Sequence, residues 1–197
     1  SVLGMDPWRD IGELHARLAY VPGDVALWPN LTGGEVIDLM GRLQGGHDPA
    51  RRAELLDMFD LDPTKKSRSY SKGNRQKVAL IAAFMTRADV LLLDEPTAGL
   101  DPLMEAEFQA LAREASGRGQ TVFLSSHLLD EVEDICGRVA ILRGGRLIEV
   151  ATLDELRRIG STVVEATITS GKFVNAREEI SRSWPSNGLV RREVLRG

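Results

Sequence analysis

Two adjacent carboxylates, Asp94 and Glu95, directly follow a short apolar run at residues 90–93. A run this short and unbroken is typical of a strand buried on both faces of a parallel sheet. Open α/β proteins bind their ligands at the carboxyl edge of such a sheet. Because successive strand residues point to opposite faces, we expect the two carboxylates to do different work, one holding Mg²⁺ through water and the other orienting an attacking water. The alternative is that the pair merely begins a loop.

A polar segment at residues 70–78 stands directly ahead of an apolar helix and could bind a phosphate. Ser71 is a candidate N-cap, and Gly73 would let another backbone approach closely. The first N–H groups of a helix have no partner within it and can bind an anion. The alternative is ordinary helix capping without a ligand.

A histidine, His127, follows the strand predicted at residues 121–125. Parallel strands end at the same edge of a sheet, so this strand delivers His127 to the edge that carries Asp94 and Glu95. That position favours a functional role over the structural role of most isolated histidines. His15 and His47 lack such a context, and we expect both at the surface.

The elements that must position these side chains are predicted from apolar spacing and turn residues. Strands alternate with helices, which indicates an α/β fold around a largely parallel sheet. Past residue 160 an alternation at residues 163–168 allows one further strand, and the rest of the tail shows little pattern. Strands are expected at residues 18–21, 90–93, 121–125, 139–143 and 146–150, and helices at about 33–44, 49–60, 73–87, 102–116, 128–136 and 153–159, with 61–70 as a polar loop.

The composition is that of an ordinary globular chain, with 197 residues, 43% apolar and 27% charged. A formal charge of −4, from 25 basic and 29 acidic residues, offers no excess positive field to phosphate backbones, so we expect no nucleic-acid partner. The single cysteine, Cys136, cannot form an internal disulfide and favours a reducing compartment. No apolar run approaches the roughly 18 residues that a membrane-spanning helix needs.

In these motifs the chain resembles the ATP-binding cassette (ABC) ATPases, the nucleotide-hydrolysing subunits of ABC transporters. Residues 70–78 are similar to the family signature, residues 91–96 to its Walker B strand and catalytic glutamate, and residues 98–101 to its D-loop. Residues 125–127 match its switch histidine, and order and spacing agree over residues 18–155. Residues 20–24 and 28–32 are most similar to the bacterial drug- or antibiotic-exporter branch, whose partner is a separate membrane protein.

The resemblance implies a P-loop NTPase-like fold, with a helical subdomain at about residues 33–88. This subdomain would lie in a partial nucleotide-binding domain at residues 1–160, followed by a C-terminal extension at 161–197. ATP and Mg²⁺ would be the cofactors, and ATP hydrolysis the activity. The implied partners are a transmembrane permease subunit and a second ATPase subunit, identical or not, and the implied location is cytoplasmic, on the inner face of the cell membrane.

The same resemblance gives roles to the residues of the sheet edge. Asp94 would hold Mg²⁺ through water, Glu95 would polarise the attacking water, and His127 would contact the γ-phosphate. The loop near residues 22–29 would face the membrane partner.

The resemblance also gives roles to residues that act across a head-to-tail dimer with two shared sites. Ser71 and Gly73 would touch the γ-phosphate of ATP held by the second subunit, and Asp101 would couple the two sites. Lys72 and Asn74 complete the cofactor-binding loop. They stand where the signature has Gly and Gln, which would alter the phosphate contact without abolishing the loop.

Two further departures bear on activity. Gly23 stands where the family has the Q-loop glutamine, with Asp24 beside it as the candidate substitute. The chain also has no Gly-x-x-x-x-Gly-Lys-Ser/Thr, the loop that cradles the β- and γ-phosphates. In the family this loop lies upstream of the Q-loop, so we interpret the start at Ser1 as loss of the N-terminal part. The chain alone is therefore expected to bind ATP poorly and to be inactive.

Two other functions stay open on the sequence. One is a non-catalytic interaction module that docks on a membrane partner, or lends its signature loop to an intact subunit, without turning over ATP. The other is a soluble ABC ATPase that acts on ribosomes or DNA. The latter would carry a second cassette or a long coiled-coil insertion, which these 197 residues lack, and the charge of −4 also argues against it.

Overall fold

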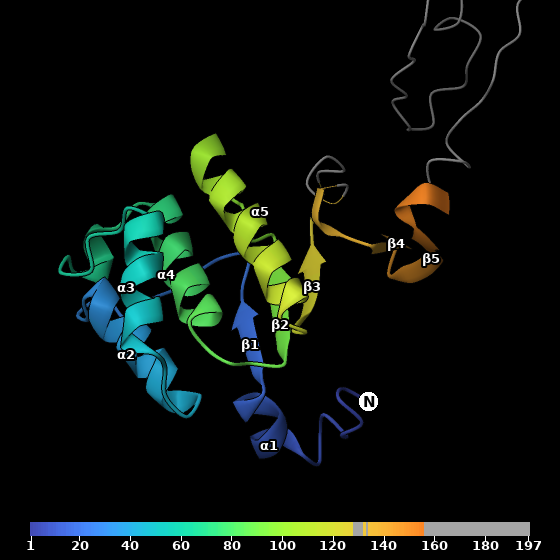
Figure 1. The fold of residues 1–197 in the computed structure, drawn as a ribbon, viewed down its shortest axis with the longest axis horizontal. Coiled ribbons are helices and arrows are strands. Elements are labelled where there is room, and N and C mark those ends of the chain that lie inside the picture. The colour runs from blue at the N-terminus through green and yellow to red at the C-terminus, as the bar shows by residue number, and fades with distance from the viewer. Residues whose placement is uncertain (128–131, 133, 156–197) are drawn as a thin grey trace, which may run out of the picture. The chain divides into compact units, whose positions relative to one another are not determined.

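The computed structural model describes residues 1–127, 132 and 134–155, and its architecture is mixed α/β (Figure 1). Ser1–Cys136 form one compact unit, and a second unit begins at Gly137. In the first unit three parallel strands pair in chain order: β1 (Leu18–Val21), β2 (Val90–Asp94) and β3 (Thr121–Ser125). These strands and their parallel pairing confirm the prediction to within one residue.

β2 is the central strand and buries one of its faces fully. Leu91 pairs with Val122 of β3, and Leu91 is 0% exposed on the face that meets the helices. On the other face Leu92 pairs with Tyr20 and Phe123, which are 55% and 64% exposed. The expected burial on both faces therefore fails at the middle of the strand, where Leu92 is only partly buried.

Four longer helices share one hydrophobic core with the sheet. They are α2 (Gly33–Leu43), α3 (Pro49–Met58), α4 (Lys72–Phe84) and α5 (Pro102–Gly117). α2 and α3 pack on α4, which in turn packs on β1, while α5 packs on β3 (Figure 1). The predicted helices are thus confirmed, although α4 ends three residues before its expected limit.

Side-chain caps explain where these helices begin. In each case a side-chain oxygen accepts a hydrogen bond from an N–H group of the first turn, which has no partner within the helix. At α2 the cap is a full capping box, since Thr32 and Glu35 bond each other's backbone N–H. The capping residues are Thr32, Asp48, Ser71 and Asp101.

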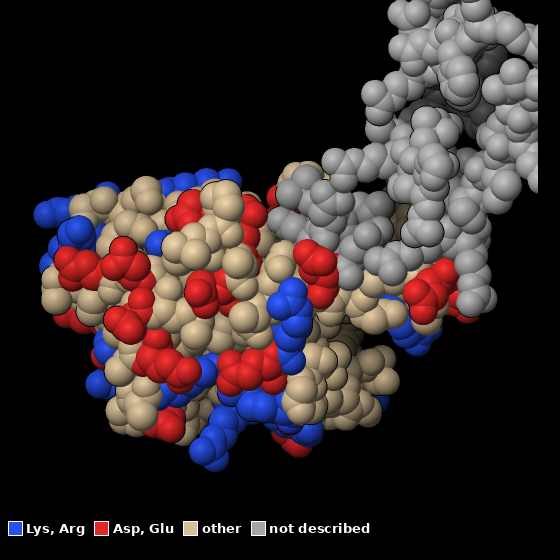
Figure 2. Space-filling model, turned by 45° about the horizontal axis from the view of Figure 1, so that its top comes forward, with Lys and Arg blue, Asp and Glu red and all other residues tan. Residues whose placement is uncertain are grey.

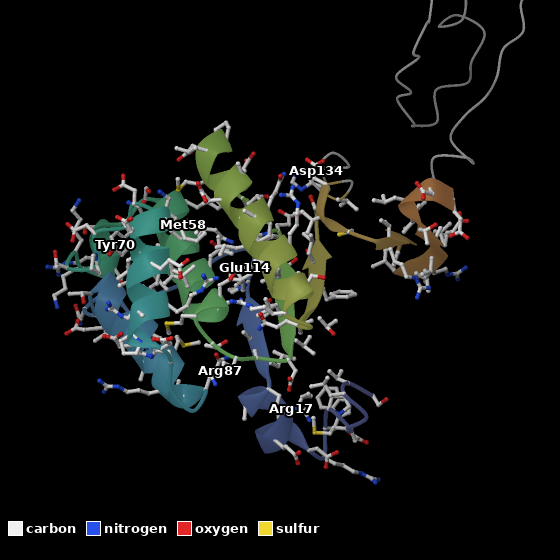
Figure 3. All side chains as sticks on the ribbon, viewed as in Figure 1. Arg17, Met58, Tyr70, Arg87, Glu114 and Asp134 are labelled. Carbon is white, nitrogen blue, oxygen red and sulfur yellow. The ribbon has the colours of Figure 1, made fainter. Side chains whose placement is uncertain are left out.

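Two short elements lie in segments for which the sequence predicts none. One is the 3₁₀ turn η1 (Ser67–Ser69), inside the expected polar loop, and the other is α1 (Ile11–Ala16). Arg17, labelled in Figure 3 at the junction of α1 and β1, forms an ion pair of 2.5 Å with Asp89 and accepts a hydrogen bond from its backbone N–H. This contact joins the segments that precede β1 and β2.

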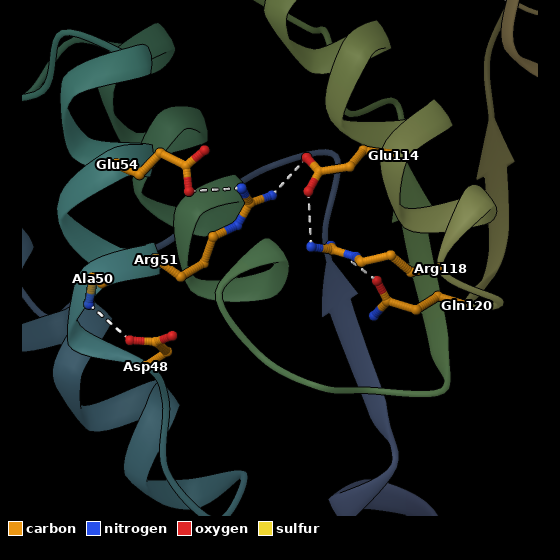
Figure 4. A network of polar contacts seen from close by, with 7 residues as sticks. All are labelled: Asp48, Ala50, Arg51, Glu54, Glu114, Arg118 and Gln120. Atoms are coloured by element: carbon orange, nitrogen blue, oxygen red, sulfur yellow. Dashed lines mark hydrogen bonds and ion pairs between the residues drawn. The ribbon is translucent and has the colours of Figure 1, made fainter.

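An ion-pair network connects α3 to α5 (Figure 4). Arg51 of α3 donates to Glu54 in its own helix at 2.9 Å and to Glu114 of α5 at 2.8 Å. Glu114 also accepts from Arg118 at 2.9 Å. The Arg51 side chain is only 14% exposed, so this contact is less screened by salt than a surface pair.

His47 is not the surface residue that the sequence predicts. Its side chain is 15% exposed, and Nε2 lies 3.7 Å from a carboxylate oxygen of Asp38. The imidazole covers Gly41 of α2 so closely that no Cβ would fit there. His47 is therefore a packing residue of the helical part.

The second unit contains an antiparallel hairpin of β4 (Arg138–Arg143) and β5 (Arg146–Thr152). Its turn residues, Gly144 and Gly145, have φ of +57° and +72°, the left-handed conformation that tight hairpins favour. Both strands confirm the prediction to within two residues. Most of the helix expected at 128–136, the end of that at 153–159 and the extension at 161–197 lie outside the described residues.

Candidate functional site

The carboxyl ends of β2 and β3 meet through Asp94 and Ser125, which are paired in the sheet register. The Ser125 hydroxyl donates to Oδ1 of Asp94 at 2.5 Å and accepts the backbone N–H of Glu95 at 3.1 Å. Asp94 is thereby oriented, and the two carboxylates lie at the expected edge of the sheet. Ser125 itself is not among the site residues predicted from the sequence.

Glu95 has an uncommon backbone conformation, with φ at +43°. A non-glycine residue in this left-handed region costs on the order of 1–3 kcal/mol, and it persists where its surroundings over-determine it. Here the Glu95 N–H also lies 3.2 Å from the Ser125 carbonyl oxygen, and the Glu95 carbonyl accepts from Ala98 at 3.1 Å. Strand β2 therefore ends in a tight turn at Glu95.

His127 lies beside Glu95, as predicted. Nδ1 of His127 is 3.3 Å from Oε1 of Glu95, with the side chains 71% and 47% exposed. Both residues line a pocket of about 250 Å³. The rest of the lining consists of the segment after Glu95, the first turn of α5 and the residue before His127, namely Thr97, Ala98, Gly99, Glu105 and Ser126.

The signature-like segment, residues 70–78, contacts the lining of this pocket at Gly99. Ser71 caps α4, and its hydroxyl accepts the Asn74 N–H at 3.2 Å, which confirms Ser71 as the N-cap of this helix. Gly73 faces the Gly99 carbonyl oxygen, and a Cβ at Gly99 would lie 3.6 Å from the Lys72 side chain. None of the residues 71–74 lines the pocket around Glu95.

Asp101 has a local structural partner at the start of α5. Its Oδ1 accepts the N–H groups of Leu103 and Met104, both at 3.1 Å. This contact fixes the end of the 97–101 segment on α5. Asp101 does not line the pocket.

Gly23 lies at the place where a side chain would reach Asp94. A Cβ at Gly23 would be 3.5 Å from Oδ2 and 3.4 Å from the backbone oxygen of Asp94. The glycine therefore leaves one face of the Asp94 carboxylate open. In the part of the chain that the structure describes, no cluster of three or more His, Cys, Asp or Glu residues could hold a metal ion.

The surface carries charges of both signs. Figure 2 shows acidic and basic side chains interspersed over the face in view. Among the described residues no helix is both long and apolar enough to span a bilayer.

Comparison with known proteins agrees with the motifs. Residues 3–98 match the family model "ABC transporter". The daunorubicin resistance ATP-binding protein DrrA3 of Streptomyces coeruleorubidus is 39% identical over 164 residues, which cover 80% of this chain and 51% of that protein. The bacitracin transport ATP-binding protein BcrA of Enterococcus faecalis is 29% identical, over 87% of this chain and 57% of its own length. The chain thus spans about half the length of the curated relatives it matches.

Solved structures give the same result. The ATP-binding subunit of an ABC transporter superimposes with a TM-score of 0.74 at 30% identity, over 81% of this chain and 68% of that one. The dimeric ATP-binding cassette MJ0796, in a post-hydrolysis state with ADP and Pi, superimposes with a TM-score of 0.66 at 22% identity, over 76% of this chain and 68% of its own. The latter supports the fold alone. The fold is that of an ABC cassette of the P-loop NTPase type, and the chain belongs to the family of ABC transporter ATP-binding subunits.

Proposed function

We propose that this chain is part of the ATP-hydrolysing subunit of an ABC exporter and couples hydrolysis to transport by a separate membrane permease. The observation that carries the proposal is the grouping of Asp94, Glu95 and His127 at one sheet edge, beside a pocket. DrrA3 and BcrA are named for daunorubicin resistance and bacitracin transport, which supports the exporter branch.

Glu95 would orient and polarise the attacking water. Its carboxylate is half exposed on the pocket, and its backbone is held by Ser125, so the group is available and positioned. His127, whose Nδ1 lies 3.3 Å from Oε1 of Glu95, would restrain the carboxylate and contact the γ-phosphate with its other ring nitrogen. Donation to both groups at once needs the imidazolium, in which both ring nitrogens carry a proton.

Asp94 fits a Mg²⁺ ion held through water. One carboxylate oxygen accepts from Ser125, and the other faces the space that Gly23 leaves open. Mg²⁺ in such sites keeps several waters and takes one or two carboxylates besides the phosphates, so a single carboxylate is sufficient. When bound, the ion would neutralise charge on the β- and γ-phosphates.

The residues 71–74 would serve the site of a second ATPase subunit. Ser71 caps α4, and Lys72 and Asn74 belong to its first turn, whose N–H groups attract phosphate. Gly73, which has no side chain, lets the backbone of Gly99 approach this turn closely. Asp101 would couple the two sites across the dimer interface.

The proposed function also implies limits for the domains of the chain. α2, α3 and α4 would form the helical subdomain at residues 33–88, inside a nucleotide-binding domain at residues 1–160. The permease would meet the loop at residues 22–29, on the inner face of the membrane, and the 161–197 extension would follow the domain.

The test is a chimera in which the phosphate-binding segment of a related ABC cassette, with its Gly-x-x-x-x-Gly-Lys-Ser/Thr, precedes the chain. We expect Mg²⁺-dependent ATP hydrolysis that Glu95→Gln lowers about 10²–10⁴-fold, the usual effect of losing a positioned general base. ATP binding should persist, because the amide keeps the shape of the carboxylate.

The matched control is Glu107→Gln on α5, a half-buried carboxylate that does not line the pocket. It should hydrolyse ATP at the parental rate. A chimera that binds ATP without hydrolysing it would instead favour the non-catalytic interaction module, whereas turnover that is insensitive to Glu95→Gln would contradict the role proposed for Glu95.

A further inference from the structure

Gln76 of α4 is a polar side chain buried to 1% exposure. Its Nε2 donates to the backbone carbonyl of Pro96 at 3.0 Å, across 20 residues of sequence. Burying an amide is unfavourable unless it is hydrogen-bonded, so this contact must form for the helix to pack as it does. The bond is directed at the residue that follows Glu95.

The turn at Glu95 is therefore held from two sides. On one side Ser125 accepts the Glu95 N–H with its hydroxyl and its carbonyl. On the other side Gln76 holds Pro96, whose peptide continues directly from the strained Glu95 backbone. Loss of either anchor would let the left-handed residue relax toward a commoner conformation.

A second contact of α4 reinforces the same segment. Gly73 approaches the Gly99 carbonyl so closely that a Cβ there would lie less than 3.0 Å from it. Pro96 and Gly99 are thus both in contact with the first turn and a half of α4. Two residues of the 96–99 segment, which follows Glu95, are thus held against α4.

We infer that Gln76 is a positioning residue that holds the Glu95 turn, so that the place of the Glu95 carboxylate depends on α4. Gln76 does not line the pocket and acts only through Pro96. The catalytic consequence rests on the proposed function, whereas the restraint on the turn does not. Movement of residues 71–74 by a ligand would then be transmitted to Glu95 of the same chain.

The chain supplies two matched controls. Gln44 donates from Nε2 to the Leu18 carbonyl at 2.9 Å, and Gln120 donates to the Ala88 carbonyl at 2.6 Å. Both bonds are partly buried, and both lie at the amino ends of β1 and β2, the opposite end of the sheet from Glu95. Replacing each glutamine by Met removes the same donor and keeps the length of the side chain.

The first measurement is amide hydrogen exchange on the 197-residue chain carrying Gln76→Met, Gln44→Met or Gln120→Met. We expect the Glu95 and Ala98 amides to exchange about five- to tenfold faster in Gln76→Met, the ratio that corresponds to one lost hydrogen bond. In the two control variants the exchange rates of these two amides should stay within twofold of the parent. The unfolding midpoints of the controls should nevertheless fall by about as much as that of Gln76→Met.

The second measurement is steady-state hydrolysis in the chimera described above. Gln76→Met should lower kcat about tenfold and leave KM for ATP unchanged, since nucleotide binding does not use the Glu95 turn. The inference is overturned if the Glu95 and Ala98 amides are unaffected, if the controls accelerate them equally, or if an active chimera keeps its kcat. If the parent chimera does not hydrolyse ATP, the proposed function fails, and the exchange result alone decides the role of Gln76.

Discussion

Gly73 and Gly99 approach each other so closely that a Cβ on Gly73 would lie under 3.0 Å from the Gly99 carbonyl oxygen. The contact joins the first turn of α4 to the segment that follows Glu95. Packing within the chain therefore requires a glycine at position 73. This requirement is independent of any phosphate that the segment binds across a dimer.

Gly73→Ala should therefore destabilise the isolated chain. The methyl group cannot be accommodated without moving α4 or the Gly99 backbone, and such overpacking costs about 1–3 kcal/mol. Urea unfolding would measure the loss. Gly12→Ala is the matched control, because Gly12 is also the second residue of a helix but its Cβ would meet no atom within 4 Å. Equal midpoints for the two variants would remove the steric argument.

Ser125→Ala should impair the site without unfolding the sheet. The change removes the donor to Asp94 and one acceptor of the Glu95 N–H, and a hydrogen bond to a charged group is worth about 1.5–3 kcal/mol. In the chimera we expect kcat to fall at least tenfold and exchange of the Glu95 amide to accelerate. Ser125→Thr keeps the hydroxyl and suits a strand, so it should retain most of the turnover. A Thr variant as weak as the Ala variant would contradict this role.

Glu114→Gln should weaken the connection between α3 and α5. Glu114 accepts from both Arg51 and Arg118, and the Arg51 side chain is mostly buried, with its Nε unpaired (Figure 4). The change leaves Arg51 with the carboxylate of Glu54 but without that of Glu114, and we expect a loss of about 1–2 kcal/mol in urea unfolding.

The control for Glu114 is an exposed ion pair elsewhere in the chain. Arg9 lies 4.0 Å from Asp6, and its side chain is 87% exposed. Such pairs contribute about 0–1 kcal/mol, so Arg9→Gln should change the free energy of unfolding by less than about 0.5 kcal/mol. Similar losses of unfolding free energy in Glu114→Gln and Arg9→Gln would contradict the prediction that burial of Arg51 strengthens its ion pair.

Cys136 should react slowly in the folded chain. Burial raises the pKa of its thiol above the ordinary value, so less thiolate is present near neutral pH. Alkylation by iodoacetamide should be slower than for a free thiol, and should accelerate as pH rises through the raised pKa. Because the folded pKa lies above the unfolded one, this thiol contributes stability below the unfolded pKa, and the contribution is lost at alkaline pH. The chain has no other cysteine, and reaction as fast in the native as in the denatured chain would contradict the burial.

Local sequence determined most of the elements and the edge where the site lies. Residues 121–125 form a strand with the predicted limits, and helix caps at Thr32, Ser71 and Asp101 set the starts of α2, α4 and α5. These signals are local, because a cap or a turn needs only a few consecutive residues. The Asp-Glu pair after a buried strand was sufficient to predict the sheet edge.

Tertiary structure alone decided how the site is held. Ser125 meets Asp94 across 31 residues, and Gln76 meets Pro96 across 20, so neither contact has a local signal. Contacts of this kind depend on the register of β2 with β3 and on the depth to which α4 packs. Both are set by burial of the apolar core that β1, β2, β3 and the four longer helices share.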